Sequence, residues 1–155
     1  MIKETNKLLE VEDLRMHFPV KGGVMMKQVG AVKAVDGVSF QIGSGETLGL
    51  VGESGCGKST LGKAVVRLLN PTTGRVSFKG NDITRMRQWR LRKLRQDFQM
   101  VFQDPAESLD ARMSVGDLVA EPLVIQRLGG RKSRREKVAD LLDRVGLPKN
   151  AAQKF

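Results

Sequence analysis

The chain has 155 residues, of which 40% are apolar and 28% are charged, and its net charge is +10. This length and composition are those of one globular domain and exclude a disordered or low-complexity polypeptide. The single cysteine excludes an intrachain disulfide, and no apolar run approaches the roughly 18 residues that a membrane-spanning helix needs.

The first predicted element is a β-strand with a bulge, because two alternating apolar patterns follow each other with a slip of one residue. The apolar residues of the two patterns are Leu9, Val11, Leu14, Met16 and Phe18. Residues 19–30 are predicted to form a loop or the tip of a hairpin. Residues 32–40 are predicted to form a second strand region, which ends before a glycine-rich turn.

A glycine-rich segment then fits G-x-x-x-x-G-K-[ST], the pattern of a phosphate-binding P-loop. The residues of the segment are Gly52, Glu53, Ser54, Gly55, Cys56, Gly57, Lys58, Ser59 and Thr60. An apolar run at residues 48–51 precedes it and predicts a buried strand, and an amphipathic helix follows. An ordinary tight turn is the alternative, but such a turn does not require Gly-Lys-Ser in order at a helix start. The sequence therefore predicts a nucleotide site.

Each part of this segment has a predicted role in holding phosphate. The glycines expected to adopt positive φ and to approach an anion closely are Gly52, Gly55 and Gly57. Lys58 is expected to reach the β- and γ-phosphates, Ser59 to bind Mg²⁺, and Thr60 to donate to the α-phosphate. Cys56 lies inside the loop, so modification of its thiol is expected to block nucleotide entry; the alternative is a small residue that the turn tolerates.

The helix after the P-loop is predicted to run through Leu68 and to stop at residues 70–71, because Pro71 cannot continue it. The elements predicted after it are a short strand at residues 76–78, a basic amphipathic stretch at 84–95, a buried strand at 98–102, and helices through 115–119 and 138–145.

The basic residues are clustered, with six in residues 85–95 and six more in residues 127–137. Such clusters bind nucleic acid, anionic lipid or an acidic partner, or they form solvated helix faces. We interpret both as solvated faces. Trp89 is the only aromatic residue among them, which disfavours a platform for base stacking.

A second motif at residues 100–105 places Gln103 at the exit of a predicted strand, 45 residues after Lys58. A glutamine there can reach a γ-phosphate or a Mg²⁺-bound water. With these two motifs in this order, the chain resembles the ATP-binding subunits of ABC transporters, in which the second motif is the Q-loop. Residues 32–40, 45–61 and 108–123 resemble the oligopeptide, dipeptide and nickel importer branch. Departures from that branch occur at Ala106-Glu107 and Asp110-Ala111.

The resemblance implies an α/β fold: a P-loop NTPase (RecA-like) core with an antiparallel β subdomain over about residues 1–105. The start of an α-helical subdomain would follow over about residues 106–155, so that residues 1–155 form a truncated ABC domain. The resemblance also implies that Phe18 stacks on adenine, although a core position at a strand end is the alternative. Val35 would lie beside the adenine or ribose, and Gln103 would join Ser59 in holding the Mg²⁺ of ATP.

Three motifs of a complete ABC ATPase are absent from the 155 residues. There is no Walker B strand ending in Asp-Glu, no Leu-Ser-Gly-Gly-Gln signature, and no histidine after Gln103. His17 is the only histidine and is expected to be a strand residue without a catalytic role. We therefore interpret the chain as the N-terminal part of a longer subunit, expected to bind ATP without meaningful turnover.

The resemblance further implies two kinds of partner: a second ATP-binding subunit, identical or different, and transmembrane permease subunits. The chain would then lie at the cytoplasmic face of the membrane and would not touch the transported solute. A nucleic-acid-associated ABC ATPase is an alternative that the charge of +10 favours and the importer-like sequence disfavours. A small P-loop kinase or GTPase is disfavoured because about 50 residues precede the P-loop.

Overall fold

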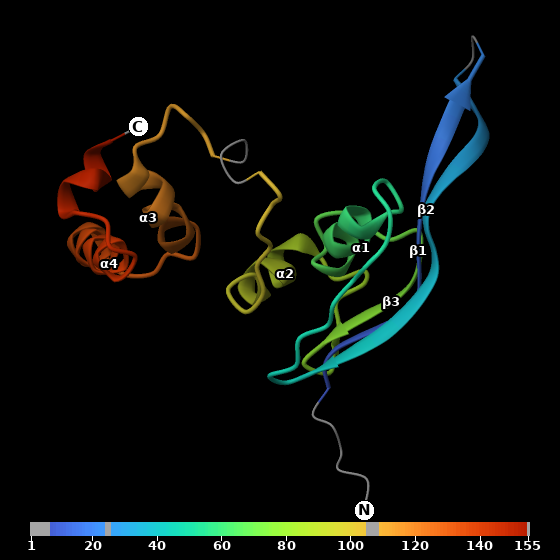
Figure 1. Ribbon diagram of the computed structural model, residues 1–155, viewed down its shortest axis with the longest axis horizontal. Coiled ribbons are helices and arrows are strands. Elements are labelled where there is room, and N and C mark those ends of the chain that lie inside the picture. Colours follow the sequence, from blue (N-terminus) through green and yellow to red (C-terminus); the bar gives the residue numbers. More distant parts are fainter. Residues whose placement is uncertain (1–6, 24–25, 105–108, 155) are drawn as a thin grey trace, which may run out of the picture. The chain divides into compact units, whose positions relative to one another are not determined.

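The computed structural model describes residues 7–23, 26–104 and 109–154. The chain divides into two compact units, residues 1–100 and residues 101–155. In the described residues, the first unit contains a β-sheet and two helices, and the second contains only helices (Figure 1). Among the residues described, no helix is long and apolar enough to cross a membrane.

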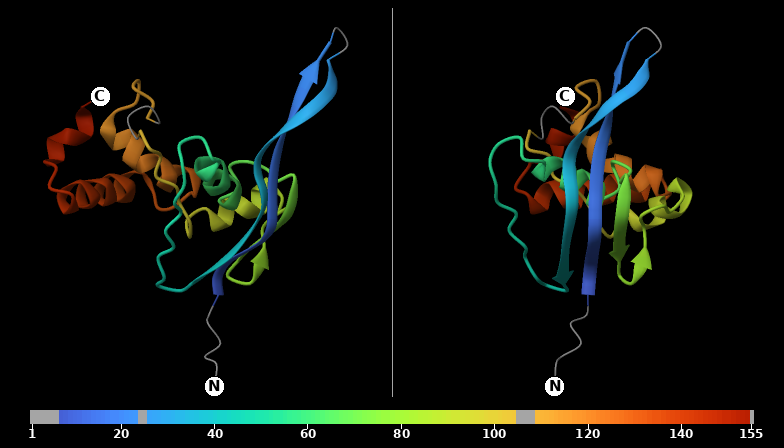
Figure 2. Two further views of the ribbon diagram at one scale, coloured as in Figure 1. Left: turned by 45° about the vertical axis from the view of Figure 1, so that its right-hand side comes forward. Right: turned by 90° about the vertical axis from the view of Figure 1, so that its right-hand side faces the viewer.

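The first unit is built on a four-stranded antiparallel sheet with the strand order β2-β1-β3-β4. The strands are β1 (Lys7–Gly22), β2 (Lys27–Gly43), β3 (Thr73–Phe78) and β4 (Asn81–Asp82). β1 and β2 form the predicted hairpin, but their paired part reaches well into the segment predicted as a loop. β3 pairs with β1 only as far as Arg15, so the rest of the hairpin is a two-stranded ribbon (Figure 2).

The predicted bulge in β1 is confirmed by a shift in the β1–β2 register between Val11 and Leu14. Asp13 within the bulge has a φ of 42°, and Val11 and Leu14 on either side are both buried. Gly74 of β3 lies against this bulge. A Cβ atom on Gly74 would be 2.4 Å from the carbonyl oxygen of Asp13, so only glycine fits there.

Two helices, α1 (Lys58–Val65) and α2 (Gln88–Leu94), contribute to one core with the sheet. The residues at the centre of this core are Val11, Leu14, Leu61, Ala64, Val76, Ile83 and Leu91. Each fully buried aliphatic side chain of this size contributes about 1.5–3 kcal/mol relative to an exposed one. The core therefore fixes α1 and α2, and with α1 the second half of the P-loop.

The helix after the P-loop is shorter than predicted, because α1 ends at Val65 rather than at residues 70–71. Arg67 has a φ of 55°, which no helix residue adopts, and its side chain is buried. Its Nε atom donates to the carbonyl oxygen of Ile83 at 2.9 Å, and its Nη1 atom donates to Asn70 Oδ1. The contact with the distant Ile83 and the local contact with Asn70 end the helix before Leu68, which is 48% exposed.

The predictions of buried strands at residues 48–51 and 98–102 are wrong. Neither segment is a strand, and Val51 and Val101 are 94% and 86% exposed. A strand buried on both faces needs neighbouring strands, and the sheet of the described residues pairs with neither segment.

The second unit consists of α3 (Val115–Ile125), α4 (Arg131–Arg144) and a 3₁₀ helix, η2 (Lys149–Gln153). Both predicted helices are present, whereas η2 was not predicted. Ser114 caps α3, because its hydroxyl oxygen accepts a hydrogen bond from the backbone N–H of Asp117 at 3.2 Å. The buried residues of this unit are Val138, Leu142 and Ala151.

Candidate functional site

The P-loop, residues 52–60, closes around the ammonium group of Lys58. Lys58 is the first residue of α1, and its Nζ atom donates to the carbonyl oxygens of Gly52 and Glu53 at 2.7 and 2.5 Å. The same Nζ atom lies 3.5 Å from the Sγ atom of Cys56. A positive charge is therefore held at the centre of the loop, where a phosphate oxygen can replace a carbonyl as its acceptor.

The glycines of the loop are required for two different reasons. Gly55 and Gly57 have φ values of 81° and 96°, as predicted, whereas the prediction of positive φ at Gly52 is wrong. Gly52 instead lies close to Cys56, whose Sγ atom would be 2.7 Å from a Cβ atom on Gly52. A Cβ atom on Gly57 would be 2.1 Å from the carbonyl oxygen of Ala34 in β2. Nothing in the sequence pointed to Ala34, because it contributes only a backbone atom.

The start of α1 offers backbone donors to an anion. The first hydrogen bond of the helix runs from the N–H of Leu61 to the carbonyl oxygen of Gly57 at 2.8 Å. The N–H groups of Lys58, Ser59 and Thr60 precede it, and neither a capping side chain nor an acidic residue competes for them in the first turn. The positive end of the helix and the Lys58 ammonium therefore fit a chain of phosphates.

A hydroxyl group is the oxygen that the P-loop offers to a metal ion. The Ser59 side chain is exposed, and the residues described include no cluster of three or more His, Cys, Asp or Glu that could hold a metal. Mg²⁺ bound to a nucleotide takes few protein ligands and completes its shell with phosphate oxygens and water. One hydroxyl at this position is consistent with such an ion.

The two residues predicted to contact the adenosine lie on the β1–β2 hairpin. Val35 is 5% exposed, and its Cγ2 atom is 3.8 Å from the Cβ position of Gly57, so it lies directly beside the P-loop. Phe18 pairs with Val32 and is 38% exposed, which leaves part of its ring open for stacking. The roles of Phe18 and Val35 toward adenosine stay predictions.

His17 lies on β1, as expected of a strand residue. Its Nε2 atom is 2.9 Å from Asp36 Oδ1 on the neighbouring strand. Hydrogen bonds from His17 and then Lys33 hold the pKa of the Asp36 carboxyl below its usual value. This cluster ties the two strands of the hairpin together at the surface.

Gln103 belongs to the second unit and is exposed, and its roles toward the γ-phosphate and Mg²⁺ stay predictions. Of the departures from the importer branch, residues 106–107 lie outside the described residues. At the second departure, residues 110–111, the carboxylate of Asp110 accepts a hydrogen bond from the side chain of Arg112 at 2.8 Å. That pair, with the backbone N–H of Arg112, lowers the pKa of Asp110 and shapes the turn before α3.

Comparisons with known proteins agree with this geometry. The sequence model of the family described as "ABC transporter" matches residues 35–155. The oligopeptide transport ATP-binding protein AppF of Bacillus subtilis (strain 168) is 47% identical over 149 residues, which cover 96% of this chain and 45% of AppF. The oligopeptide transport ATP-binding protein OppF of Escherichia coli (strain K12) is 42% identical over 151 residues, which cover 96% of this chain and 45% of OppF. The chain thus spans about half the length of these relatives.

A comparison of folds gives the same result. The dimeric ATP-binding cassette MJ0796, solved in a post-hydrolysis state with ADP and Pi, matches with a TM-score of 0.75 at 24% identity. The match covers 94% of this chain and 60% of that one. It confirms the predicted fold class, a P-loop NTPase with an antiparallel β subdomain. With the P-loop geometry and the family match over residues 35–155, it leads to one conclusion: the chain belongs to the ABC transporter family.

Proposed function

We propose that this chain is the phosphate-binding part of an ATP-binding subunit that energises a membrane importer for peptides or related solutes. The observation that carries the proposal is the P-loop, in which the Lys58 ammonium and the unpaired N–H groups at the start of α1 are available to one anion. The class of solute is taken from AppF and OppF, which are named as oligopeptide transport proteins.

Each residue of the site has one task in this proposal. Lys58 binds the β- and γ-phosphates, Ser59 and Gln103 hold Mg²⁺, and Thr60 donates to the α-phosphate. Phe18 stacks on the adenine, and Val35 packs beside it or the ribose. Phosphoryl transfer depends on positioning and on electrostatic stabilisation of the γ-phosphate. In this proposal these residues bind and position the triphosphate.

Alone, the chain holds ATP but does not complete a catalytic site. It binds ATP without meaningful turnover, because the sequence has no Walker B glutamate, no signature and no histidine beyond Gln103. A second ATP-binding subunit and transmembrane permease subunits are the proposed partners. The proposed location is peripheral, at the cytoplasmic face of the membrane, without contact to the transported solute.

The binding of MgATP to the 155-residue chain tests the proposal, with Lys58→Ala as the variant and Lys63→Ala as the matched control. Lys63 is on the same helix and carries the same charge, but it lies outside the P-loop. Loss of charge-assisted hydrogen bonds to phosphate should weaken binding at least about tenfold in Lys58→Ala, and the control should stay within about twofold. Equal affinities of Lys58→Ala and the unaltered chain would refute the proposed site. An ATP hydrolysis rate well above that of Lys58→Ala would refute the proposed lack of turnover.

A further inference from the structure

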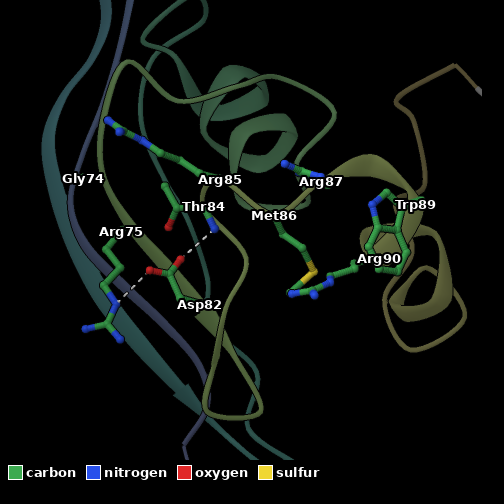
Figure 3. Close-up of a pocket in the computed structure, with 9 residues that line it drawn as sticks. All are labelled: Gly74, Arg75, Asp82, Thr84, Arg85, Met86, Arg87, Trp89 and Arg90. Carbon is green, nitrogen blue, oxygen red and sulfur yellow. Dashed lines mark hydrogen bonds and ion pairs between the residues drawn. The ribbon is translucent and has the colours of Figure 1, made fainter.

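A cavity of the first unit lies between the end of the sheet and α2, and no residue of the P-loop lines it. Its volume is about 860 Å³, which is within the range of small-molecule sites. The charged and aromatic residues that line it, here termed the arginine pocket, are Arg75, Asp82, Arg85, Arg87, Trp89 and Arg90. Arg75 and Arg85 lie on the strand side and Trp89 and Arg90 on the helix side (Figure 3).

The segment that carries most of these side chains is anchored at both ends. Before it, Ile83 is 1% exposed, and the Thr84 hydroxyl accepts a hydrogen bond from the N–H of Val76 at 2.7 Å. After it, Leu91 is fully buried, and its N–H donates to the carbonyl oxygen of Arg87 at 3.1 Å. The arginine side chains therefore start from fixed backbone positions, as a preorganised site requires.

The pocket has four guanidinium groups and one carboxylate. Arg75 is already neutralised, because it lies 3.4 Å from Asp82 and 3.8 Å from Glu12. Within the part of the chain that the structure describes, Arg85, Arg87 and Arg90 form no ion pair. Three uncompensated cations thus line one cavity, an arrangement that an anion would relieve.

The type of side chain narrows the chemistry of that anion. The guanidinium group of arginine is a planar fork that matches the oxygen atoms of phosphate and binds them in pairs. A polynucleotide would need a series of aromatic rings for its bases, and here the guanidinium carbon of Arg90 lies 4.9 Å from the centre of the only ring, that of Trp89. A cavity of this size has room for more than one phosphoryl group.

We infer that the arginine pocket binds an anion that carries two phosphoryl groups, either a soluble diphosphate or the head group of a doubly phosphorylated lipid. Arg85, Arg87 and Arg90 supply the donors, and Arg75 is kept in place by Asp82. This site is separate from the P-loop and does not depend on the function proposed for it.

Trp89 makes the pocket directly observable, because the chain has one tryptophan and no tyrosine. In the first arm, pyrophosphate is titrated into the 155-residue chain at about 150 mM salt, where long-range attraction is screened, and the emission of Trp89 is followed. In the second arm, phosphatidylcholine vesicles with and without cardiolipin replace pyrophosphate. A saturable change of emission is expected in at least one arm, and the arm that responds identifies the source of the phosphate.

The key variant is Arg85→Gln with Arg87→Gln, and its matched control is Lys27→Gln with Lys132→Gln, which removes the same charge from exposed positions elsewhere. Loss of two charge-assisted contacts should weaken the response at least about tenfold, whereas the control and Lys58→Ala should stay within about twofold. Arg85→Lys with Arg87→Lys keeps the charge but loses both planar guanidinium groups, and it should also weaken the response.

Four outcomes would overturn the inference. The first two are an equal weakening of the Trp89 response in the Lys27→Gln, Lys132→Gln control and a loss of that response in Lys58→Ala. The third is no response in either arm from a chain that circular dichroism shows to be folded. The fourth is a response of Trp89 to an oligonucleotide and to neither pyrophosphate nor cardiolipin. If the glutamine variant does not fold, the lysine variant decides: an unchanged affinity there also overturns the inference.

Discussion

The guanidinium group of Arg95 donates to the backbone carbonyl oxygen of Arg67 at 2.9 Å, and through its other terminal nitrogen to that of Val66 at 2.6 Å. These two carbonyls directly follow the end of α1, whose own last carbonyls accept the N–H groups of Val66, Arg67 and Leu68. Burial, and then the charge of Arg95, lower the pKa of Arg67. Two neighbouring cationic side chains thus fasten the helix that begins in the P-loop.

Replacing Arg95 should therefore destabilise the first unit. Arg95→Ala leaves two carbonyl oxygens without their donors, and we expect a loss of about 1–3 kcal/mol in the free energy of unfolding. Urea denaturation followed by circular dichroism measures it. Lys93→Ala is the control, because Lys93 is an exposed residue of α2 two positions before Arg95 and should change stability by less than about 0.5 kcal/mol. Equal losses in the two variants would contradict a capping role for Arg95.

Gly57→Ala should be more damaging than an ordinary glycine replacement. It combines a φ of 96° with a Cβ atom only 2.1 Å from the carbonyl oxygen of Ala34, so β2 or the loop must move. We expect a loss of about 2–4 kcal/mol in the free energy of unfolding. Gly45→Ala is the matched control, since Gly45 has a φ of 78° with open space around it, and it should cost only about 1–2 kcal/mol. If thermal unfolding shows equal losses, the contact with Ala34 does not restrict the loop.

Alkylation of Cys56 should abolish the binding of MgATP. The thiol is exposed and lies 3.5 Å from the Nζ atom of Lys58, so an added group would fill the space that phosphates need. N-ethylmaleimide treatment followed by a binding assay tests this. Cys56→Ser should bind MgATP and resist the reagent, and MgATP added first should slow the modification. If the alkylated chain still bound MgATP fully, the phosphates would not occupy the space beside Cys56.

Stability should depend on pH through Asp82. Hydrogen bonds from Thr84, together with the charge of Arg75, hold the pKa of this carboxyl below its usual value. Only in the folded chain do these contacts stabilise the ionised carboxylate, so Asp82 stabilises the fold at neutral pH. That contribution is lost as the pH falls from about 3.9, the value of an unfolded Asp, through the lower folded value. The difference in unfolding free energy between the unaltered chain and Asp82→Asn should therefore be largest near neutral pH and shrink below about pH 4. A difference that is constant with pH would contradict this role.

The sequence was sufficient where structure is decided locally. The P-loop follows from the order Gly-Lys-Ser at a helix start, and the bulge of β1 from the slip between Val11 and Leu14. The sequence pattern was insufficient where contacts with distant segments determine the local structure. The end of α1 depends on Arg67 and Arg95, whereas the sequence pattern predicts Arg95 on a solvated helix face. The strands predicted at residues 48–51 and 98–102 require neighbours that no pattern within those segments can supply.

The exposure of the apolar residues Val51 and Val101 bears on how the chain behaves at high concentration. Extended apolar segments with unpaired backbone groups are templates on which one molecule pairs with another. The net charge of +10 opposes such encounters, because every molecule repels the next. Salt shortens the range of that repulsion to about 10 Å at 0.1 M and leaves apolar attraction in place. The colloidal state of the chain should therefore follow ionic strength, dispersed in dilute buffer and associating as salt is added.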